Sequence, residues 1–453
     1  MAFASLRSVR TVVTRWATLA VGALWVVPAG AAQDLFSVWQ QAEQHNAQYA
    51  ADLAATQADQ EAVAQARANL LPTLNAEASL SSSDRRAVRN LQHGQQHNIN
   101  QWAFTLRQPV INLQALSLYE GAQHQAAAAV LRSEAARQQL MLRVSQQYFD
   151  ILAAQDRLRS LHAEYQAIDQ QLHAAERSFE LGGATITDTY EARSRLDLLR
   201  NQQLAAERDL RDRLQQLTTL LGQPVNDLAV LNTRIRLSPL EHTERHDWLS
   251  QAEQANLEVL QRQLLWQASQ SQLTAAKREH TPTLSLQARS GSSNQQGIYG
   301  MNQGPRALDS SVGLELAIPL YQGGAISSRV RERSARVHEQ RFLLEQQRRD
   351  AREAAQRHLD GVQSGLQQVA ALEAAEQSSR ASVEANELAY EVGVRVSVDV
   401  LNAQRQLYET QRALAQARYD ALMQSLRLKA ATGSLDEQDL LRLNQLLEHD
   451  TLE

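Results

Sequence analysis

The chain repeats itself at a nearly constant spacing, and this duplication constrains its fold more than any other feature. Six landmarks recur 210 or 211 residues apart: 42–46 and 252–256, 72–74 and 282–284, Pro109 and Pro319, Gly182 and Gly393, Asp188 and Asp399, Gly222 and Gly433. Such regular self-similarity indicates a tandem duplication of about 200 residues. We therefore expect residues 33–235 and 236–433 to form two structural repeats that share one fold.

The N-terminal segment differs in composition from both repeats. Three arginines precede an apolar run over residues 16–27, and small residues fill positions 29–32. A positive start, a short apolar core and small residues at the end predict a secretory signal peptide over residues 1–32, cleaved after Ala31 or Ala32. A membrane anchor is the alternative, although the run is short for a bilayer span. The signal places the mature chain outside the cytoplasm.

Composition argues against several functional classes. The chain has no cysteine, which removes disulfide frameworks, thiolate nucleophiles and cysteine zinc sites. Its formal net charge of -5 gives no basic surface for nucleic acid, so no nucleic-acid partner is expected. Neither a nucleophile elbow nor a phosphate-cradling glycine loop is present. We therefore expect no enzyme activity, no catalytic residues and no cofactor; a hydrolase is the weakest of the alternatives.

Two long stretches are free of proline. Residues 110–221 and 320–432 contain none and are rich in Ala, Gln, Leu, Arg and Glu. Because proline breaks helices and these residues favour them, both stretches are predicted to be long helices. Gly182-Gly183 interrupts the first stretch and Gly393 the second, so each repeat offers two helices joined by a glycine turn. A cytoskeletal type of coiled coil is the alternative, which the duplication disfavours.

Between the paired prolines the hydrophobic period changes from helical to two. Apolar and polar residues alternate after Pro72 and Pro282 and again before Pro109 and Pro319. This pattern predicts strands with one apolar and one polar face, in hairpins over 73–109 and 283–319 with polar loops over 82–98 and 290–310. Each run has about 8 to 11 residues, the length of a tilted strand that crosses a bilayer. Trp102 fits an interfacial aromatic girdle or simple strand packing.

Four strands cannot close a barrel, and an open sheet edge cannot lie in lipid. Closure therefore requires an oligomer, in which two chains would contribute eight strands and three would contribute twelve. Eight-stranded barrels are filled by side chains, whereas the long helices favour a conduit. The preferred interpretation is a homotrimer.

Four segments carry a family resemblance: 390–403 (YEVGVRVSVDVLNA) followed by Leu407-Tyr408, its counterpart 179–188, the strand-to-helix junction 319–324, and 433–441 with Asn444 just after it. In this order, on this duplication, the chain resembles the TolC family of trimeric outer-membrane channel-tunnels of Gram-negative bacteria. The resemblance extends over the whole mature length.

The resemblance implies a mainly α-helical protomer with a membrane β-barrel portion. Four strands per chain would build a twelve-stranded trimeric barrel in outer-membrane lipid, which continues into a long periplasmic α-helical barrel. Residues 434–453 would form a C-terminal equatorial segment. The implied function is a passive exit duct with a periplasmic iris gate, in tripartite efflux or type I secretion. The implied partners are a periplasmic adaptor (membrane fusion protein) and an inner-membrane pump, either an RND or an ABC exporter. A soluble periplasmic coiled-coil tether or adaptor is the alternative.

The resemblance also implies gate residues at the closed periplasmic end. Carried over by motif, Tyr390 and Arg395 would bond Thr187 and Asp188, within and between chains. From the residues alone, Tyr390 is equally suited to pack against a neighbouring helix, and Arg395 would be a solvated charge. Asp188 follows a glycine turn and is also placed to cap a helix N-terminus.

A pore constriction is implied at Asp399 and Asn402. The family has two acidic positions per chain at its narrowest aperture, and the second of them is Asn402 here. A trimer of this chain would therefore carry one acidic ring instead of two. Asp399, like its repeat equivalent Asp188, has helix capping as the alternative role.

Two histidine pairs are candidate metal ligands. His93 and His97 lie in a predicted outer loop, and His242 and His246 are four residues apart near Asp247. Neither pair has an evident third ligand, so solvated histidines are the preferred interpretation and no metal site is expected.

Overall fold

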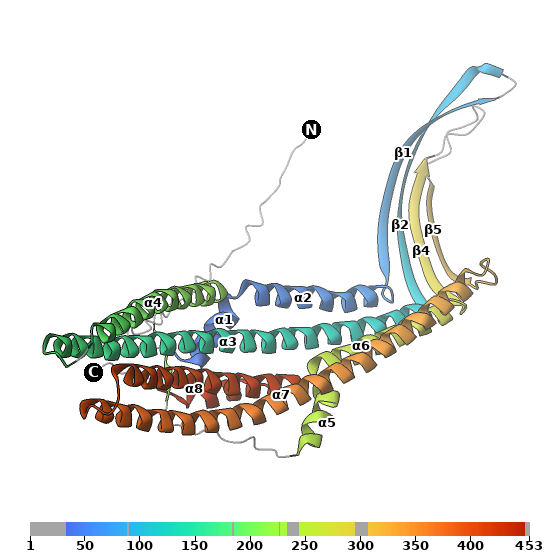
Figure 1. Cartoon of the computed structure of the whole chain (residues 1–453). Coiled ribbons are helices and arrows are strands. Elements are labelled where there is room, and N and C mark those ends of the chain that lie inside the picture. Colours follow the sequence, from blue (N-terminus) through green and yellow to red (C-terminus); the bar gives the residue numbers. More distant parts are fainter. Residues whose placement is uncertain are drawn as a thin grey trace, which may run out of the picture.

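The computed structural model describes residues 33–448, apart from 88–89, 184, 226, 233–243 and 295–306. The predicted signal peptide therefore lies outside the described residues, as do the last five residues of the predicted C-terminal segment. The described chain consists of long helices with a sheet at one end (Figure 1).

The same order of elements occurs twice along the chain. The first half contains α1 (Leu35–His45), α2 (Ala47–Ala68), β1 (Thr73–Ala87), β2 (Asn90–Ile111), α3 (Leu113–Glu180) and α4 (Ile186–Leu221). The second half contains α5 (Arg245–Ala255), α6 (Leu257–Arg278), β4 (Thr283–Asn294), β5 (Ala307–Ala317), α7 (Ala325–Glu391) and α8 (Ser397–Ala431). The remaining elements are β3 (Val230–Leu231), α9 (Glu437–Asn444) and β6 (Leu447–Glu448).

Equivalent helices of the two halves have nearly equal lengths, which confirms the tandem-repeat fold. The first half has helices of 11, 22, 68 and 36 residues, and the second has helices of 11, 22, 67 and 35. At 1.5 Å per residue, α3 is roughly 100 Å long. Among the described residues, no helix combines the length and the apolar character needed to cross a membrane.

A single asparagine in each half joins two shorter helices end to end. Asn46 caps α2, because its Oδ1 accepts the Tyr49 amide at 2.9 Å, and its Nδ2 donates to the Leu220 carbonyl of α4 at 3.0 Å. Asn256 caps α6 in the same way and donates to the Ala431 carbonyl of α8 at 2.9 Å. One side chain thus satisfies free backbone groups at the start of one helix and the end of another. The stacked pairs run beside the long helices α3 and α7 (Figure 1).

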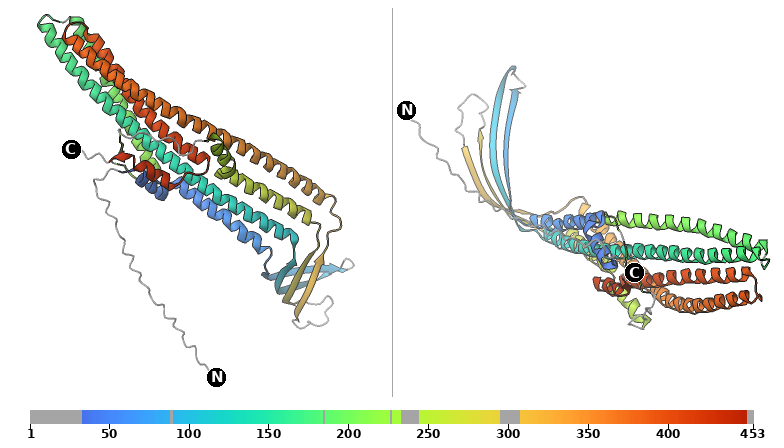
Figure 2. Two further views of the ribbon diagram at one scale, coloured as in Figure 1. Left: turned by 90° about the horizontal axis from the view of Figure 1, so that it is seen from below. Right: turned by 90° about the vertical axis from the view of Figure 1, so that its left-hand side faces the viewer.

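The two halves pack against each other along the helices. α3 contacts α6 and α8 of the second half in addition to α2 and α4 of its own. Figure 2 shows this arrangement from two further sides, with the sheet at one end of the helices and two helix-joining turns at the other. The sheet and the turns are therefore separated by the length of the long helices.

The largest buried cluster lies midway along the helices and includes both ends of the described chain. It contains residues from α1, α2, α3, α4, α8 and α9. Arg137 of α3 donates to Glu43 at 2.8 Å and to Glu437, and its guanidinium lies 5.2 Å from the centre of the buried Trp39 ring. Asn444 accepts the Phe36 amide at 3.3 Å. The C-terminal helix α9 is thereby bound to the N-terminal helix α1.

The sheet contains four strands in the order β1-β2-β4-β5, all antiparallel. We call a set of residues that lie directly opposite one another across the strands a row. In the central part of the sheet, odd-numbered residues are opposite odd-numbered ones and lie on one face, and even-numbered residues lie on the other. The even face carries exposed apolar side chains: Leu74, Leu80, Trp102, Phe104, Leu308, Val312, Leu314 and Leu316. Trp102 also contacts Phe104 edge to face, with ring centres 5.8 Å apart.

The predicted loop between the first two strands is wrong in its extent. β1 continues to Ala87 and β2 begins at Asn90, so most of 82–98 is paired strand. In the second half, β4 continues to Asn294 and β5 begins at Ala307. Inter-strand backbone hydrogen bonds do not depend on side-chain polarity, so the ladder extends beyond the apolar stretch that marked the predicted strands.

Equivalent glycines end α4 and α8 in different surroundings, and this difference predicts unequal costs of substitution. Gly222 and Gly433 both have positive φ, +69° and +72°. A Cβ on Gly222 would meet nothing within 4 Å, whereas one on Gly433 would collide with the Ala255 carbonyl group. Gly222→Ala is expected to cost about 1 kcal/mol from backbone strain, and Gly433→Ala about 2 kcal/mol because steric overlap adds to that strain.

Thermal melting followed by circular dichroism measures both variants against the unmodified protein. Equal losses for Gly222→Ala and Gly433→Ala would contradict the close packing of the α8–α9 turn on the junction of α5 and α6.

Candidate functional site at the helix tips

Two glycine turns form the tips of the helical hairpins. Gly182 between α3 and α4 has φ +79°, and Gly393 between α7 and α8 has φ +76°. In each turn the following amide closes a wide backbone loop, from Gly183 to the Ser178 carbonyl at 2.8 Å and from Val394 to the Ala389 carbonyl at 2.9 Å. Gly183 has no positive φ. Only the first glycine of the predicted Gly182-Gly183 pair is therefore needed for the turn geometry.

The first tip is closed by a capping box. Asp188 accepts hydrogen bonds from the Thr185 amide at 2.9 Å and the Thr185 hydroxyl at 2.7 Å. The Thr185 hydroxyl in turn accepts the Asp188 amide at 3.3 Å. Within this chain Asp188 therefore has the capping role that its position after a turn allowed.

The second tip lacks this capping box, although it has the same aspartate. The N-cap of α8 is Val396, which has no polar side chain. Asp399 instead forms an ion pair with Arg395, with Nη1 and Oδ2 3.3 Å apart. The position equivalent to Arg395 in the first half is Ala184. The duplicated aspartates have thus diverged, because Val396 replaces the threonine and Arg395 supplies a cation.

Asn402 takes part in a contact between α4 and α8. Arg195 of α4 donates from Nη2 to the Asn402 Oδ1 at 2.8 Å and from Nη1 to the Leu401 carbonyl at 3.4 Å. Glu191, the repeat equivalent of Asn402, lies 3.7 Å from the same guanidinium. Arg195 therefore joins the two tips one helical turn away from Asp399. Sequence reasoning missed Arg195, although its distance from Glu191 and the duplication provided a signal.

The four predicted gate residues are not joined to one another within the described chain. Thr187 is exposed, Tyr390 is half-buried, and no hydrogen bond or ion pair of the described residues connects Tyr390 or Arg395 to Thr187 or Asp188. Arg395 is held by Asp399, and Asp188 by Thr185. The resemblance also implies gate links between neighbouring chains. The bonds from Tyr390 and Arg395 to Thr187 and Asp188 of a neighbouring chain therefore stay a prediction.

A buried ion pair further along the helices connects the first half to the second. Arg412 of α8 donates to Glu164 of α3 at 2.7 Å and to the Ser160 hydroxyl at 3.3 Å. The side chains of Glu164 and Arg412 are only 5% and 19% exposed. Burial raises the pKa of the Glu164 carboxyl, although the bond from Arg412 opposes that rise. Ion pairing and burial therefore have opposite effects on the pKa of this carboxylate.

A second polar contact lies two helical turns along the same helix pair. The Tyr419 hydroxyl of α8 donates to Asp156 of α3 at 2.7 Å, and its ring stacks on Phe149 with centres 5.8 Å apart. Burial raises the pKa of the Asp156 carboxyl, and the bond from Tyr419 partly offsets this. We call the two contacts, Glu164–Arg412 and Asp156–Tyr419, the α3–α8 seam. Sequence analysis did not identify these residues.

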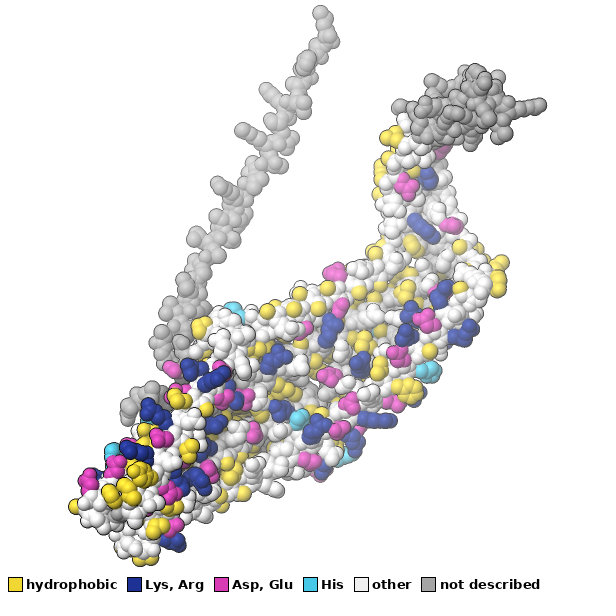
Figure 3. All heavy atoms as spheres, turned by 45° about the horizontal axis from the view of Figure 1, so that its top comes forward, with side chains coloured by type: hydrophobic (Ala, Val, Ile, Leu, Met, Phe, Trp, Pro, Cys, Tyr) yellow, Lys and Arg dark blue, Asp and Glu magenta, His cyan; other side chains and the backbone are white. Residues whose placement is uncertain are grey.

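The tips expose a group of large apolar side chains. Figure 3 shows hydrophobic side chains at the end of the helices remote from the sheet. The exposed members around the two turns are Phe179, Leu181, Ile186, Tyr190, Leu388, Val392, Val394 and Val396. Leu181 and Val394 are 87% and 76% exposed in the single chain. Apolar surface of this kind is characteristic of a site that contacts another protein.

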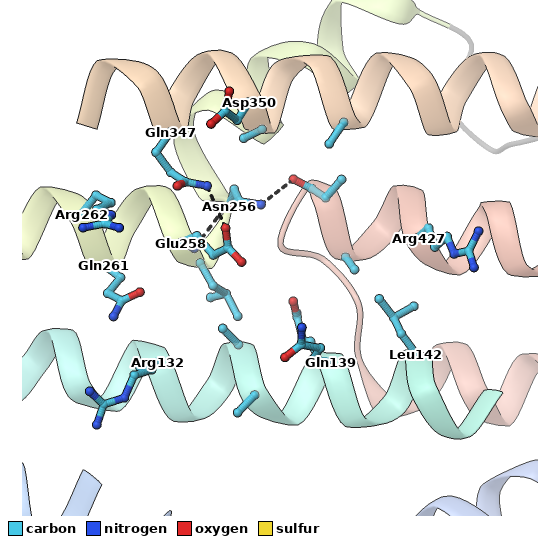
Figure 4. A pocket seen from close by; sticks show the side chains of 18 of the residues that line it. Arg132, Gln139, Leu142, Asn256, Glu258, Gln261, Arg262, Gln347, Asp350 and Arg427 are labelled. Atoms are coloured by element: carbon cyan, nitrogen blue, oxygen red, sulfur yellow. Dashed lines mark hydrogen bonds between the residues drawn. The ribbon is translucent and has the colours of Figure 1, made fainter. Parts of the chain in front are cut away.

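A polar cavity of about 810 Å³ lies where the stacked helices meet (Figure 4). Side chains of both charges line it, among them Arg132, Glu258, Arg262 and Asp350. Among the described residues, no group of three or more His, Asp or Glu side chains is placed to hold a metal ion. Of the predicted histidine pairs, His246 lies on α5, while His242 and the side chains of His93 and His97 are outside the described part.

Comparison with known proteins identifies the family. The model of the family described as outer membrane efflux protein matches residues 38–223 and again residues 248–434. This chain belongs to that family. The two matches coincide with the two halves of the fold, so the family unit occurs once in each half.

Individual relatives agree with this assignment. The outer membrane protein TolC of Vibrio cholerae is 29% identical over 415 residues, which cover 91% of this chain and 93% of the relative. The alkaline protease secretion protein AprF of Pseudomonas aeruginosa is 30% identical over 339 residues, 74% of this chain and 70% of the relative. The structure of the Vibrio cholerae outer membrane protein VceC has a TM-score of 0.76 at 18% identity, covering 88% and 96% of the two chains.

These matches confirm the resemblance to the TolC family and the mainly helical, duplicated fold. The protein is an outer-membrane exit duct for efflux and secretion, and the alternative of a soluble tether is excluded. The relatives reported above are named as outer-membrane and secretion proteins, which favours a function without catalysis.

Proposed function

We propose that three copies of this chain close their sheets into one barrel. The observation that carries this proposal is a sheet with an apolar face, a polar face and two open edges, β1 and β5. Strand β5 of one copy would pair with β1 of the next, so that twelve strands leave no edge in lipid. The even-numbered apolar residues then face the membrane, and the odd-numbered residues face the lumen. The signal peptide over 1–32 would deliver the chain to this location.

The helices would continue the duct through the periplasm to a constriction at their tips. Three copies of α3, α4, α7 and α8 would enclose the passage, and Asp399 and Asn402 would line its narrowest part. Transport would be passive and would require no cofactor. The electrostatic barrier at the constriction would fall when the tips separate.

Contacts between chains would hold the tips closed. Arg395 is more than half exposed and reaches Asp399 of its own helix. In a ring of three copies, we infer that Arg395 and Tyr390 also approach Thr187 and Asp188 of neighbouring tips. Each such contact is weak when exposed, at most about 1 kcal/mol, but a threefold ring repeats it symmetrically.

The proposed partners follow from the tips and from the relatives. The exposed apolar residues around Leu181 and Val394 provide a surface for a periplasmic adaptor. The family description supports an efflux pump as the inner-membrane partner, and the likeness to a protease secretion protein supports a protein exporter. The resemblance to the TolC family implies that these would be of the RND and ABC types, respectively.

Single-channel recording in planar bilayers tests the duct and its closed tips together. The unmodified protein is expected to conduct weakly, and Arg395→Ser with Tyr390→Phe is expected to raise conductance severalfold because contacts that close the tips are lost. Arg245→Gln, on α5 away from the tips, is the matched control and should leave conductance unchanged. A folded, membrane-inserted protein without any conductance would refute the duct. Equal conductance of the double variant would remove these two residues from the gate.

A further inference from the structure

Two arginines lie next to each other on the polar face of the sheet, and neither is ion-paired within the described part of the chain. Arg107 of β2 is opposite Gln287 of β4, and Arg289 of β4 is opposite Thr105 of β2. The two arginines are therefore diagonal neighbours, about 7–8 Å apart by ordinary sheet geometry. Both are exposed, and neither forms an ion pair or a side-chain hydrogen bond with the described residues.

The acidic residues of this face lie in other rows of the sheet, and only Asp309, of those described, is a diagonal neighbour of one of the arginines, Arg289. Glu77 of β1 and Asp309 of β5 share one row, separated by the small residues Ala103 and Gly291. Glu315 of β5 lies on the other side of the arginine rows. Its carboxylate already accepts hydrogen bonds from the Gln287 amide and the Ser285 hydroxyl. Along the strands the order of rows is therefore acidic, basic, basic, acidic.

Like charges in adjacent rows repel each other unless an anion lies between them. A guanidinium offers planar donors that match carboxylate and phosphate oxygens. Three symmetric copies would place six such groups in two neighbouring rings, inside a wall of low dielectric that strengthens their field.

We propose that Arg107 and Arg289 form an anion-binding band on the inner wall of the barrel, which binds carboxylate or phosphate groups of solutes in transit. This inference rests on the proposed function, because it requires three sheets to close with their odd-numbered faces inward. The band is separated from the acidic residue Asp399 by the length of the long helices. Arg107 is opposite Thr73, the first residue of β1, so the band lies at the end of the sheet next to the helices. Anions would therefore bind in the barrel near its junction with the helices, and cations near the periplasmic tips.

Block of ion current by multivalent anions tests the band. Inositol hexakisphosphate and benzenehexacarboxylate represent the two oxygen chemistries, and uncharged inositol is the control solute. Both anions are expected to block from the external side at lower concentration than from the periplasmic side. Because each arginine contact with a charged oxygen is a strong hydrogen bond, Arg107→Gln with Arg289→Gln should raise the half-blocking concentration about tenfold or more.

Matched variants separate charge from structure. Arg107→Lys with Arg289→Lys keeps the charge and should retain most of the block, whereas Arg245→Gln should retain all of it. Block that is equal from both sides, or that ignores the double glutamine variant in a conducting channel, would overturn the band. Failure of every variant and of the unmodified protein to conduct would instead contradict the proposed duct. Weaker adsorption of the double glutamine variant to anionic lipid, with unchanged block, would place the arginines on the membrane face and also overturn the band.

Discussion

Replacement of Arg412 by methionine is expected to lower the free energy of unfolding by about 3 kcal/mol per chain, because it leaves a buried carboxylate without its cation. Glu164 is only 5% exposed and receives a 2.7 Å hydrogen bond from Arg412. The expected readout is a fall of roughly 5 °C or more in the thermal midpoint of helix circular dichroism. The matched control is Arg357→Met on α7, whose pair with Glu353 is 66% and 72% exposed and should contribute less than about 1 kcal/mol.

The pH dependence of Arg412→Met provides a second, independent readout. Burial raises the pKa of Glu164 in the folded chain, so the folded state binds this proton more tightly than the unfolded state. Stability from this group is present below its unfolded pKa and is lost as pH rises through the raised folded pKa. Loss of Arg412 removes an influence that lowers the pKa, so the variant should be destabilised more at pH 8 than at pH 5. Adding Glu164→Gln should restore part of the stability. Equal losses for Arg412→Met and Arg357→Met would contradict the burial of this pair.

Replacement of Asp399 by asparagine is expected to abolish block by a trivalent cation such as hexamminecobalt. Three carboxylates around the axis would attract cations, and each charge-assisted contact contributes enough for the loss of all three to weaken block about a hundredfold. Asn402 adds an amide oxygen and no charge, so the unmodified channel should show only modest block. Asn402→Asp should tighten it, although Arg195, which donates to Asn402 at 2.8 Å, would offset part of the new charge.

A role of Asp399 outside the pore predicts a different result. Its carboxylate forms an exposed pair with Arg395 at 3.3 Å. If it only neutralises Arg395 and lies outside the lumen, Asp399→Asn would leave block and ion selectivity unchanged. Arg395→Ser provides a check in the same recordings, since removal of the neighbouring cation should strengthen block when Asp399 lines the pore.

Much of the fold could be predicted from the sequence, because the signals that begin and end its helices and strands are local. Proline-free stretches, glycine turns and a change of hydrophobic period mark the helices, tips and strands of each half. The sequence showed only that Asn46 and Asn256 recur at equivalent positions of the two halves. The structure shows that each joins two helices into one stack. Strand lengths were underestimated, since backbone pairing extends past the apolar residues.

The contacts of the candidate site could be predicted less well from the sequence, because they depend on the rotation of the long helices relative to one another. The contact between Glu164 and Arg412 joins residues 248 positions apart, and periodicity within one helix cannot predict the rotation of its neighbour. The separate roles of Asp188 and Asp399 had a local signal, because Thr185 is able to complete a capping box and Val396 is not. Arg195 had a partial signal in its spacing from Glu191, but its contact with Asn402 depends on how α4 and α8 lie side by side.

The mass of the particle in detergent, measured by light scattering with the detergent contribution subtracted, tests the central claim that several chains close one duct. The sheet of a single chain has open edges at β1 and β5, so the account predicts a monodisperse particle of three chains. A stable monomer that inserts into bilayers and conducts ions would contradict it, because one chain would then have closed a barrel with four strands.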